Sequence, residues 1–338
     1  MRRSVKSGVA TASITLTVAL ILTACGSGTA NNTNGDAAAG ETFEFTFEYA
    51  SGPDDDPVYQ ETTVEVPKNP ANVVIFDIAT LDTFGSLGGE AAGAPLEWVP
   101  DYLQQYLADD AYDAGTLFEA DLLTIEANQP DLILIGGRSS TLYQELSQIA
   151  PTVDLTSQGS FEETMARNVT FLGEVLGAED AAATALDELT AGIEEARQVT
   201  AGIGTGLSVI VSGDRISALK PSNGDYSDRN LRTGLVYDVF GVTPVVTDIE
   251  AATHGEPISF EFLLEHDPDY LFVTDRNAAT GEANGDSARV VLDNPIVRQT
   301  TAHRENQIVY LDPTAWYIVF GGITTTQIMI DQILEIAA

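Results

Sequence analysis

The sequence predicts an α/β fold with two lobes joined by a long helix. Short apolar segments typical of buried strands alternate with helical patterns on both sides of a proline-free stretch, residues 161–200. Such alternation indicates βα units and a parallel sheet in each lobe. Residues 130–138 and 268–276 form a weak internal repeat, in which a Pro-Asp pair opens a hydrophobic strand. About 300 residues follow the N-terminal segment, a length that suits two domains.

The N-terminus predicts export. Three basic residues precede an apolar stretch, residues 8–24, and small residues lead to Cys25. This order is typical of a signal peptide, which we expect over residues 1–24. The run Leu-Thr-Ala-Cys resembles a bacterial lipobox, which implies cleavage before Cys25 and lipid on it. The protein would then be anchored to the cell membrane on the extracytoplasmic side. An uncleaved membrane helix is the alternative, but the stretch is short and rich in Ala, Ser and Thr.

The charge of the chain excludes one class of partner. It has 51 acidic and 15 basic residues, a net charge of −36, and loss of the signal would remove three more positive charges. Nucleic acid is excluded as a partner because phosphate binding requires a basic surface. Most of the acidic residues are expected to form a solvated shell. Cys25 is the single cysteine of the sequence, so no disulfide is expected.

The elements are expected in the following order. A flexible tether over residues 25–40 precedes an alternating strand, 42–49, with one aromatic face. A turn and a second strand, 62–66, complete a hairpin. Residues 161–200 are expected as one helix, weakened only by Gly173, Gly177 and Gly192. The other expected strands are 73–76, 132–135, 207–211, 270–273 and 308–311, with helices at 80–87 and 142–150. The resulting divisions are a first lobe over 41–159, a connecting helix over 160–201 and a second lobe over 202–338.

The internal repeat places one arginine in each lobe. Arg138 and Arg276 each follow the repeat's aspartate by seven positions, directly after a hydrophobic strand. Open α/β sheets bind ligands at the carboxyl ends of their strands. Two arginines at such edges would face one another across a cleft, in a chain that has few positive charges. The alternative is that each arginine is solvated in a loop.

Several short motifs in the second half carry a family resemblance. They contain Arg232, Thr253-His254-Gly255, Asp275-Arg276-Asn277 and Trp316-Tyr317. They resemble the lipoproteins that bind petrobactin and other catecholate siderophores for bacterial iron ABC importers. The resemblance is best over residues 212–322 and extends to 69–82 and 117–119. It implies two Rossmann-like lobes joined by a rigid backbone helix, as in periplasmic binding proteins of the helical-backbone class. It also implies capture of a ferric siderophore and its delivery to an ABC permease, with no intrinsic cofactor and no catalysis.

The resemblance implies a set of ligand-binding residues: Arg138, Arg232, Arg276, His254 and Tyr317. A ferric tris-catecholate is a trianion with flat aromatic faces, which guanidinium groups bind through charge-assisted hydrogen bonds and cation–π contacts. If the siderophore supplies only four donor atoms, His254 and Tyr317 are candidate Fe³⁺ ligands. The alternatives are a backbone hydrogen bond for His254 and a core position for Tyr317. The helix-forming stretch 98–109 lacks the lysine that relatives often carry, so no ligand contact is assigned there.

The resemblance also implies a docking surface. Acidic residues on each lobe of such receptors contact arginines of the permease, and Glu119 and Glu261 lie at comparable places, each before a Pro-Asp strand unit. They could equally be two acids among many. The run Asp54-Asp55-Asp56 follows Gly-Pro in a turn and is expected to be solvated. The receptor is expected to act as a monomer.

Four other functions are alternatives to a siderophore receptor. A zinc or manganese receptor would need several converging histidines or carboxylates, and the sequence has three histidines. A haem or cobalamin receptor of the same fold stays open, because arginines also suit propionates. An α/β enzyme is disfavoured because no nucleophile elbow, phosphate loop or metal-binding helix motif is found. A purely structural surface lipoprotein would not need paired arginines at strand ends.

Overall fold

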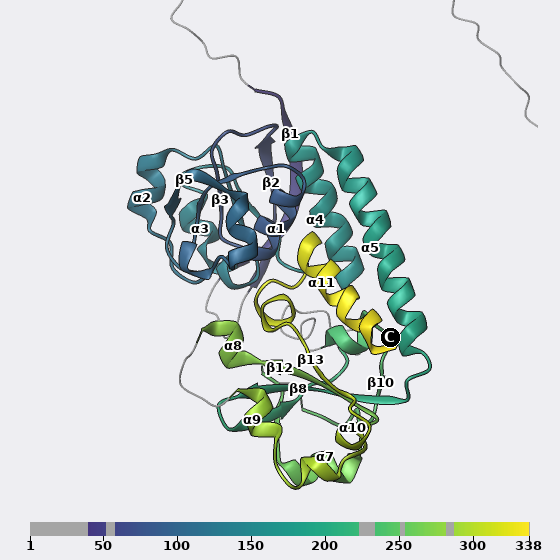
Figure 1. The fold of residues 1–338 in the computed structure, drawn as a ribbon. Helices are drawn as coiled ribbons and strands as arrows, with labels where there is room; N and C mark the ends of the chain where they lie inside the picture. Colours follow the sequence, from purple (N-terminus) through teal and green to yellow (C-terminus); the bar gives the residue numbers. More distant parts are fainter. Residues whose placement is uncertain (1–39, 52–57, 223–233, 251–253, 282–286, 338) are drawn as a thin grey trace, which may run out of the picture. The chain divides into compact units, whose positions relative to one another are not determined.

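The chain folds around two β-sheets flanked by helices, as the computed structural model shows (Figure 1). The structure describes residues 40–51, 58–222, 234–250, 254–281 and 287–337. These residues belong to one unit of the chain, Gly40–Ala338. We call the part built on the sheet that contains β3 the first lobe and the part built on the sheet that contains β8 the second lobe. The predicted α/β fold is therefore confirmed.

The first lobe has a parallel sheet with the strand order β5-β4-β3-β6-β7. Its central strands, β3 and β6, are buried on both faces, as their continuous Val, Ile and Leu runs predict. Its strands are β3 (Val73–Ile75), β4 (Ala91–Ala94), β5 (Leu107–Asp113), β6 (Leu132–Ile135) and β7 (Thr152–Asp154). Its helical segments are α1 (Ile78–Ser86), η1 (Leu96–Trp98), η2 (Asp101–Tyr106), α2 (Leu122–Asn128), η3 (Gly137–Leu142) and α3 (Tyr143–Leu146). The expected helix over 98–109 is wrong, because 3₁₀ turns there lead into β5.

An N-terminal hairpin packs on the first lobe through its aromatic face. Strands β1 (Thr42–Ser51) and β2 (Val58–Pro67) pair antiparallel, as predicted. The ring of Phe45 lies 4.2 Å from that of Phe171, and the ring of Tyr49 lies 4.1 Å from that of Tyr143, between centroids. An isolated hairpin is marginally stable in water, so this packing accounts for its order. The run Asp54-Asp55-Asp56 lies outside the described residues.

The expected single helix over 161–200 is wrong, because two helices occupy this stretch. Helix α4 (Phe161–Leu176) ends at Gly177, which has a φ of +60°, and α5 (Glu179–Thr200) begins two residues later. A left-handed residue ends a helix, and glycine adopts that conformation without a Cβ clash. A Cβ on Gly173 would lie 2.6 Å from the Cβ of Ala182, so glycine lets α4 and α5 pack closely. Of these two helices, α5, which is about 33 Å long, is the one that runs to the second lobe (Figure 1).

The second lobe has a mixed sheet with the strand order β11-β9-β8-β12-β13, and β10 also pairs with β8. Strands β8, β12 and β13 are parallel, as expected, but β9 turns back beside β8 after Gly213, whose φ is +60°. The strands are β8 (Thr205–Ser212), β9 (Arg215–Ala218), β10 (Thr243–Pro244), β11 (Glu256–Ile258), β12 (Tyr270–Asp275) and β13 (Ile308–Tyr310). The helical segments are α7 (Phe260–His266), α8 (Arg276–Thr280), α9 (Ala288–Leu292), η4 (Val297–Gln299) and α10 (Thr301–Arg304).

After β13 the chain returns to the first lobe. A π-helical turn, η5 (Thr314–Ile318), leads into α11 (Ile323–Leu334) and a short 3₁₀ turn, η6 (Glu335–Ala337). Asp82 of α1 is fully buried, and its carboxylate accepts hydrogen bonds from the backbone N–H of Thr324 (3.1 Å) and of Thr325 (2.8 Å). A carboxylate at a helix N-terminus satisfies N–H groups that otherwise lack partners. Asp82 therefore attaches α11 to the first lobe.

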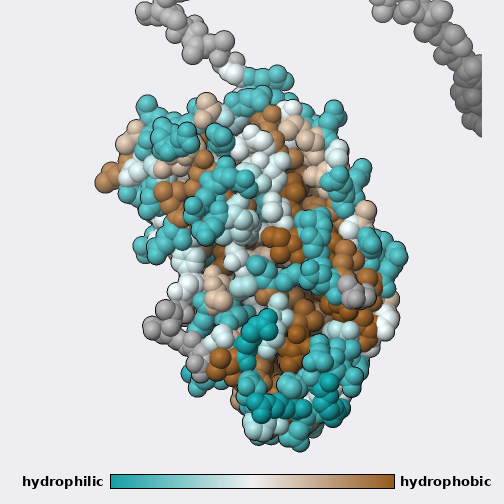
Figure 2. All heavy atoms as spheres, viewed as in Figure 1, coloured by the Kyte–Doolittle hydropathy of each residue, from teal (hydrophilic) through white to brown (hydrophobic). Residues whose placement is uncertain are grey.

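On the face drawn in Figure 2, hydrophilic residues cover much of both lobes, with hydrophobic residues visible between them. Among the residues that the structure describes, no helix is long and apolar enough to cross a membrane.

Candidate functional site

The repeated Pro-Asp-strand-arginine segment has the same construction in both lobes. In the first, the Asp131 carboxylate accepts from the backbone N–H of Asn72 (2.9 Å), next to the start of β3. In the second, the Asp269 carboxylate accepts from the backbone N–H of Thr205 (2.7 Å), at the start of β8. Each aspartate therefore aligns the repeat strand with its parallel neighbour. This shared anchoring accounts for the aspartate that both copies of the repeat contain.

Both repeat arginines lie at the carboxyl ends of their strands, as predicted. Arg138 lies in η3, directly after β6. Arg276 is the first residue of α8, directly after β12, and the carboxylate of Asp275 caps that helix by accepting from the backbone N–H of Ala278 (3.1 Å). Both side chains are partly buried. The strand-edge rule therefore placed both arginines correctly at the ends of their strands.

Tyr317 brings the two arginines together. Arg138 Nη2 donates to the Tyr317 carbonyl oxygen (3.1 Å), and Arg138 Nη1 donates to the Ile318 carbonyl oxygen (3.3 Å). Arg276 Nε donates to the Tyr317 hydroxyl (3.2 Å). One arginine from each lobe thus contacts the same residue of η5. The Ile318 carbonyl is a backbone group, so no side-chain pattern in the sequence indicated its role.

His254 completes this cluster. Its Nδ1 lies 3.3 Å from the Tyr317 hydroxyl, and the two ring centroids are 6.3 Å apart at 27°. The His254 side chain is exposed. Gly255 lies next to β9, where a Cβ would be 2.5 Å from the Ala218 carbonyl oxygen, and its φ is +79°. Glycine after the histidine therefore allows the loop to approach β9 closely.

Tyr317 is itself firmly supported. It is 4% exposed, and the adjacent Trp316 donates through Nε1 to the Gln332 side-chain oxygen (2.8 Å). The Trp316 ring also lies 5.4 Å from that of Phe240, between centroids. The phenol ring is thus held in the protein interior, while its hydroxyl meets Arg276 and His254. The alternative that Tyr317 is a core residue is correct for the ring and incomplete for the hydroxyl.

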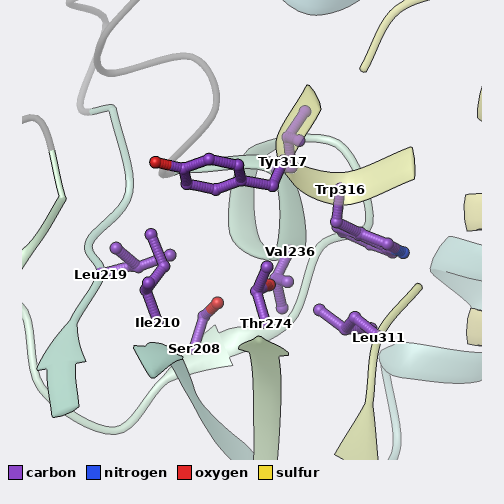
Figure 3. Close-up of a pocket in the computed structure, with 9 residues that line it drawn as sticks. Ser208, Ile210, Leu219, Val236, Thr274, Leu311, Trp316 and Tyr317 are labelled. Carbon is purple, nitrogen blue, oxygen red and sulfur yellow. The ribbon is translucent and has the colours of Figure 1, made fainter. Parts of the chain in front are cut away.

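A small cavity lies beneath Tyr317 (Figure 3). The ring extends over Ile210 and Ser208, with its hydroxyl directed away from Trp316. The hydroxyl groups of Ser208 and Thr274 belong to the lining of this cavity, among apolar side chains. Its volume, ≈ 10 Å³, suits about one water molecule.

Some predicted residues fall elsewhere. Arg232 and Cys25 lie outside the described residues. Glu119 and Glu261 are exposed, but they do not occupy the same place in the repeat. Glu119 precedes the Asp121 cap of α2, whereas Glu261 lies in the first turn of α7. Within the described ranges, no group of three or more His, Cys, Asp or Glu side chains could hold a metal ion.

Sequence reasoning missed the groups behind Arg138. Asp154, the last residue of β7, is 1% exposed and lies beside the loop that carries the arginine. Arg167 of α4 donates through Nη2 to the carbonyl oxygens of Leu155 (3.1 Å) and Thr156 (2.6 Å). Burial lowers the pKa of Arg167, and the charge of Asp154 opposes this shift. The available signal was an aspartate at the end of the short segment Thr152-Val153-Asp154.

Several known proteins are similar to this chain in sequence and fold. Residues 73–315 match the family described as periplasmic binding protein. The chain is 32% identical to the petrobactin-binding protein YclQ of Bacillus subtilis over 326 residues, which cover 95% of this chain and 96% of that protein. The crystal structure of YclQ superposes with a TM-score of 0.73, covering 86% of this chain and 99% of that one.

Two other solved structures are similar. A TroA-like periplasmic binding protein from Xylanimonas cellulosilytica is 59% identical, with a TM-score of 0.85, covering 88% of this chain and 99% of that one. The periplasmic catecholate-siderophore binding protein VctP from Vibrio cholerae is 31% identical, with a TM-score of 0.73, covering 81% of this chain and 96% of that one.

Proposed function

This chain belongs to the periplasmic binding protein family, and from that premise we propose that it captures a ferric siderophore, of catecholate type, and delivers it to an ABC importer. Two named relatives point to this ligand class, since YclQ is a petrobactin-binding protein and VctP a catecholate-siderophore binding protein. The observation that carries the proposal is the meeting of Arg138 and Arg276 at Tyr317. The protein binds its ligand without transforming it.

The arginines suit an anionic aromatic ligand. Each guanidinium has five N–H donors, and the contacts to the Tyr317 and Ile318 carbonyls use two of those of Arg138. The remaining donors can bind catecholate oxygens, and the guanidinium plane can stack on a catecholate ring. We propose Arg232 as a third member of the set. Three positive charges would balance the trianion as it leaves water.

His254 and Tyr317 are proposed as Fe³⁺ ligands when the siderophore is tetradentate. Nitrogen and oxygen ligands lie about 2.0–2.2 Å from Zn²⁺, and at such distances two adjacent octahedral ligands of a metal ion are about 3 Å apart. The observed separation of 3.3 Å between Nδ1 and the hydroxyl fits this arrangement. Arg276 donates to the same hydroxyl, so its positive charge lies next to the proposed Fe³⁺ ligand.

The setting of the receptor follows from the same proposal. Lipid on Cys25 would anchor it to the membrane on the extracytoplasmic side, with residues 25–40 as a tether and the receptor acting as a monomer. The first lobe would span 41–159, the helical connection 160–201 and the second lobe 202–338, whose last helix, α11, is attached to the first lobe through Asp82. Glu119 and Glu261, both exposed, would contact basic groups of the permease.

A binding spectrum tests the proposed function. The protein would be mixed with the Fe³⁺ complex of catechol at three catechols per iron, desalted, and its visible spectrum recorded. Retention of the catecholate-to-iron charge-transfer band is the expected result. Haem and cobalamin would be tested in the same way, and retention of their colour without retention of the ferric complex would contradict the proposal.

A further inference from the structure

We propose that Asp154, Thr156 and Ser140 are positioning residues. They hold residues 136–140, the turn that carries Arg138 and is called the Arg138 loop below, in its ligand-binding geometry. The inference rests on the proposed function, because it assigns these residues to the support of a ligand contact. None of the three was expected from the sequence to belong to the site. Their side chains form one hydrogen-bonded group behind the loop.

Asp154 is the centre of this group. Its carboxylate is buried at the end of β7, the edge strand next to β6. One oxygen, Oδ2, accepts from the hydroxyl of Ser140, which is also buried. The other oxygen, Oδ1, accepts from the backbone N–H of Thr156 (2.9 Å) and from its hydroxyl (2.5 Å). A buried carboxylate is costly unless it is hydrogen-bonded, so these contacts are strongly favoured.

These contacts fix the chain on both sides of Arg138. Before the arginine, the backbone N–H of Gly137 donates to the Thr156 hydroxyl (2.8 Å), and Gly137 has a φ of +52°. After it, Ser139 Oγ accepts from the backbone N–H of Gly136 (3.1 Å), and Ser140 is bound to Asp154. The arginine therefore extends from a loop whose flanking residues are tied to one carboxylate.

Arg167 fixes the residues that follow Asp154 in the chain. Its two hydrogen bonds to the carbonyls of Leu155 and Thr156 fix the segment that follows β7. Its Nη1 is buried and has no hydrogen-bond partner among the described residues. Arg167 also lies close enough to Asp154 for the two charges to interact.

The consequence is preorganisation of the ligand contact. A ligand that binds an already ordered arginine does not have to pay for ordering the loop. Loss of the Thr156 hydroxyl leaves the Gly137 N–H without its acceptor, and the loop then samples other conformations. A merely structural role would lower stability and leave affinity unchanged, so affinity and stability have to be measured together.

The test compares Thr156→Val with Thr156→Ser in the full mature protein, with the ferric tris-catecholate complex as the probe. Thr156→Val should weaken binding by about tenfold, the effect of one hydrogen bond, and Thr156→Ser should restore it. Ser140→Ala, which removes the contact on the other side of Arg138, should also weaken binding and serves if Thr156→Val does not fold. Thr200→Val is the matched control, because the Thr200 hydroxyl is bonded to the Phe240 carbonyl in the second lobe. It should reduce thermal stability without changing affinity.

A double-mutant cycle with Arg138→Ala separates this inference from the proposed function. In the Arg138→Ala background, Thr156→Val should produce no further loss of affinity. Wild-type affinity for Thr156→Val and Ser140→Ala, with Arg138→Ala impaired, would overturn the positioning role alone. An equal loss from Thr156→Val with and without Arg138 would also overturn it. Wild-type affinity for Arg138→Ala would instead overturn the proposed function of the arginine, and with it this inference.

Discussion

At the scale of single residues, Tyr317 organises the candidate site. Its carbonyl oxygen accepts from Arg138 and its hydroxyl accepts from Arg276, so one residue of η5 contacts both strand-end arginines. The same hydroxyl lies within hydrogen-bonding distance of His254. Two different parts of one tyrosine therefore connect groups that are far apart in the sequence. The roles of these side chains can be separated by substitution.

Each arginine is predicted to contribute to affinity without supporting the fold. Arg138→Ala and Arg276→Ala should each weaken binding of the ferric tris-catecholate complex by about 2–5 kcal/mol, because each leaves a buried anionic group unpaired. Arg232→Ala is expected to behave in the same way. Tryptophan fluorescence titrations would measure the dissociation constants.

Arg298→Ala provides the control for the arginines. Arg298 forms an exposed ion pair with Asp293 (2.6 Å), and such pairs contribute little. Its removal should leave binding unchanged. Three site variants with the affinity of Arg298→Ala would show that the arginines do not bind the ligand.

The Fe³⁺ ligand hypothesis predicts a difference between ligand classes. Tyr317→Phe and His254→Ala should weaken binding of tetradentate ferric siderophores much more than that of hexadentate ones, because a hexadentate ligand already fills all six positions. Tyr317→Phe should also abolish any phenolate-to-iron band that the protein adds to the spectrum. Equal losses for both classes would mean that the two residues shape the pocket without coordinating iron.

At the scale of elements, the join between α4 and α5 decides how the lobes are connected. The sequence pattern over 161–200 is helical throughout, and Gly177 looks like a weak point inside one helix. In the structure it is the left-handed residue that ends α4. The reversal leaves α5 as the helix that reaches the second lobe, while α4 packs beside it. Helix α11, capped by Asp82, adds a second connection to the first lobe.

Gly177→Ala is predicted to lower the free energy of unfolding by about 1 kcal/mol, because alanine is strained at positive φ. Gly202→Ala is the matched control, since no atom lies within 4 Å of an added Cβ there and its φ is not positive. Urea denaturation followed by circular dichroism would measure both. Equal stability of the two variants would contradict the assigned role of Gly177.

At the scale of the whole molecule, the excess of acidic residues dominates the electrostatics. The net charge is −36, so the acidic groups repel one another in the compact state. Added salt screens this repulsion. Among the few basic residues of the described chain, Arg138 and Arg276 lie at strand ends, where both contact Tyr317. The remaining acidic residues are available for solubility and for contact with a basic partner.

Self-repulsion predicts that salt stabilises the protein. The melting temperature should rise as NaCl is increased from about 0.01 M to about 0.5 M, since the Debye length falls from about 30 Å to a few ångströms over this range. KCl should have the same effect, because screening depends on ionic strength. Differential scanning calorimetry would measure it, and a melting temperature that is constant or falls would contradict the prediction.

The docking proposal predicts that uptake and binding can be separated. Glu119→Lys combined with Glu261→Lys should abolish uptake of the ferric siderophore by cells while leaving binding in solution intact. Glu44→Lys combined with Glu48→Lys is a matched control, because both residues are exposed on β1, away from the proposed surface. Loss of binding by the purified Glu119/Glu261 variant, or normal uptake in cells, would contradict the assignment of these residues to the docking surface.

The sequence alone determined the fold class, the N-terminal hairpin and the place of Arg138 and Arg276. These properties depend on local patterns, because apolar periodicity and a strand followed by a polar residue are written in consecutive positions. The repeat also identified equivalent strands in the two lobes, since Asp131 and Asp269 anchor these strands in the same way.

The tertiary structure decided what those patterns could not. It showed that Gly177 separates two helices, that α11 is capped by Asp82 from a segment more than two hundred residues earlier, and that Tyr317 joins both arginines. It also placed Asp154 and Thr156 behind Arg138. Such contacts involve backbone carbonyls and distant residues, and a hydrogen bond between groups far apart in the chain leaves no periodic signal in the sequence. Their geometry exists only once the two sheets and the helices between them have packed.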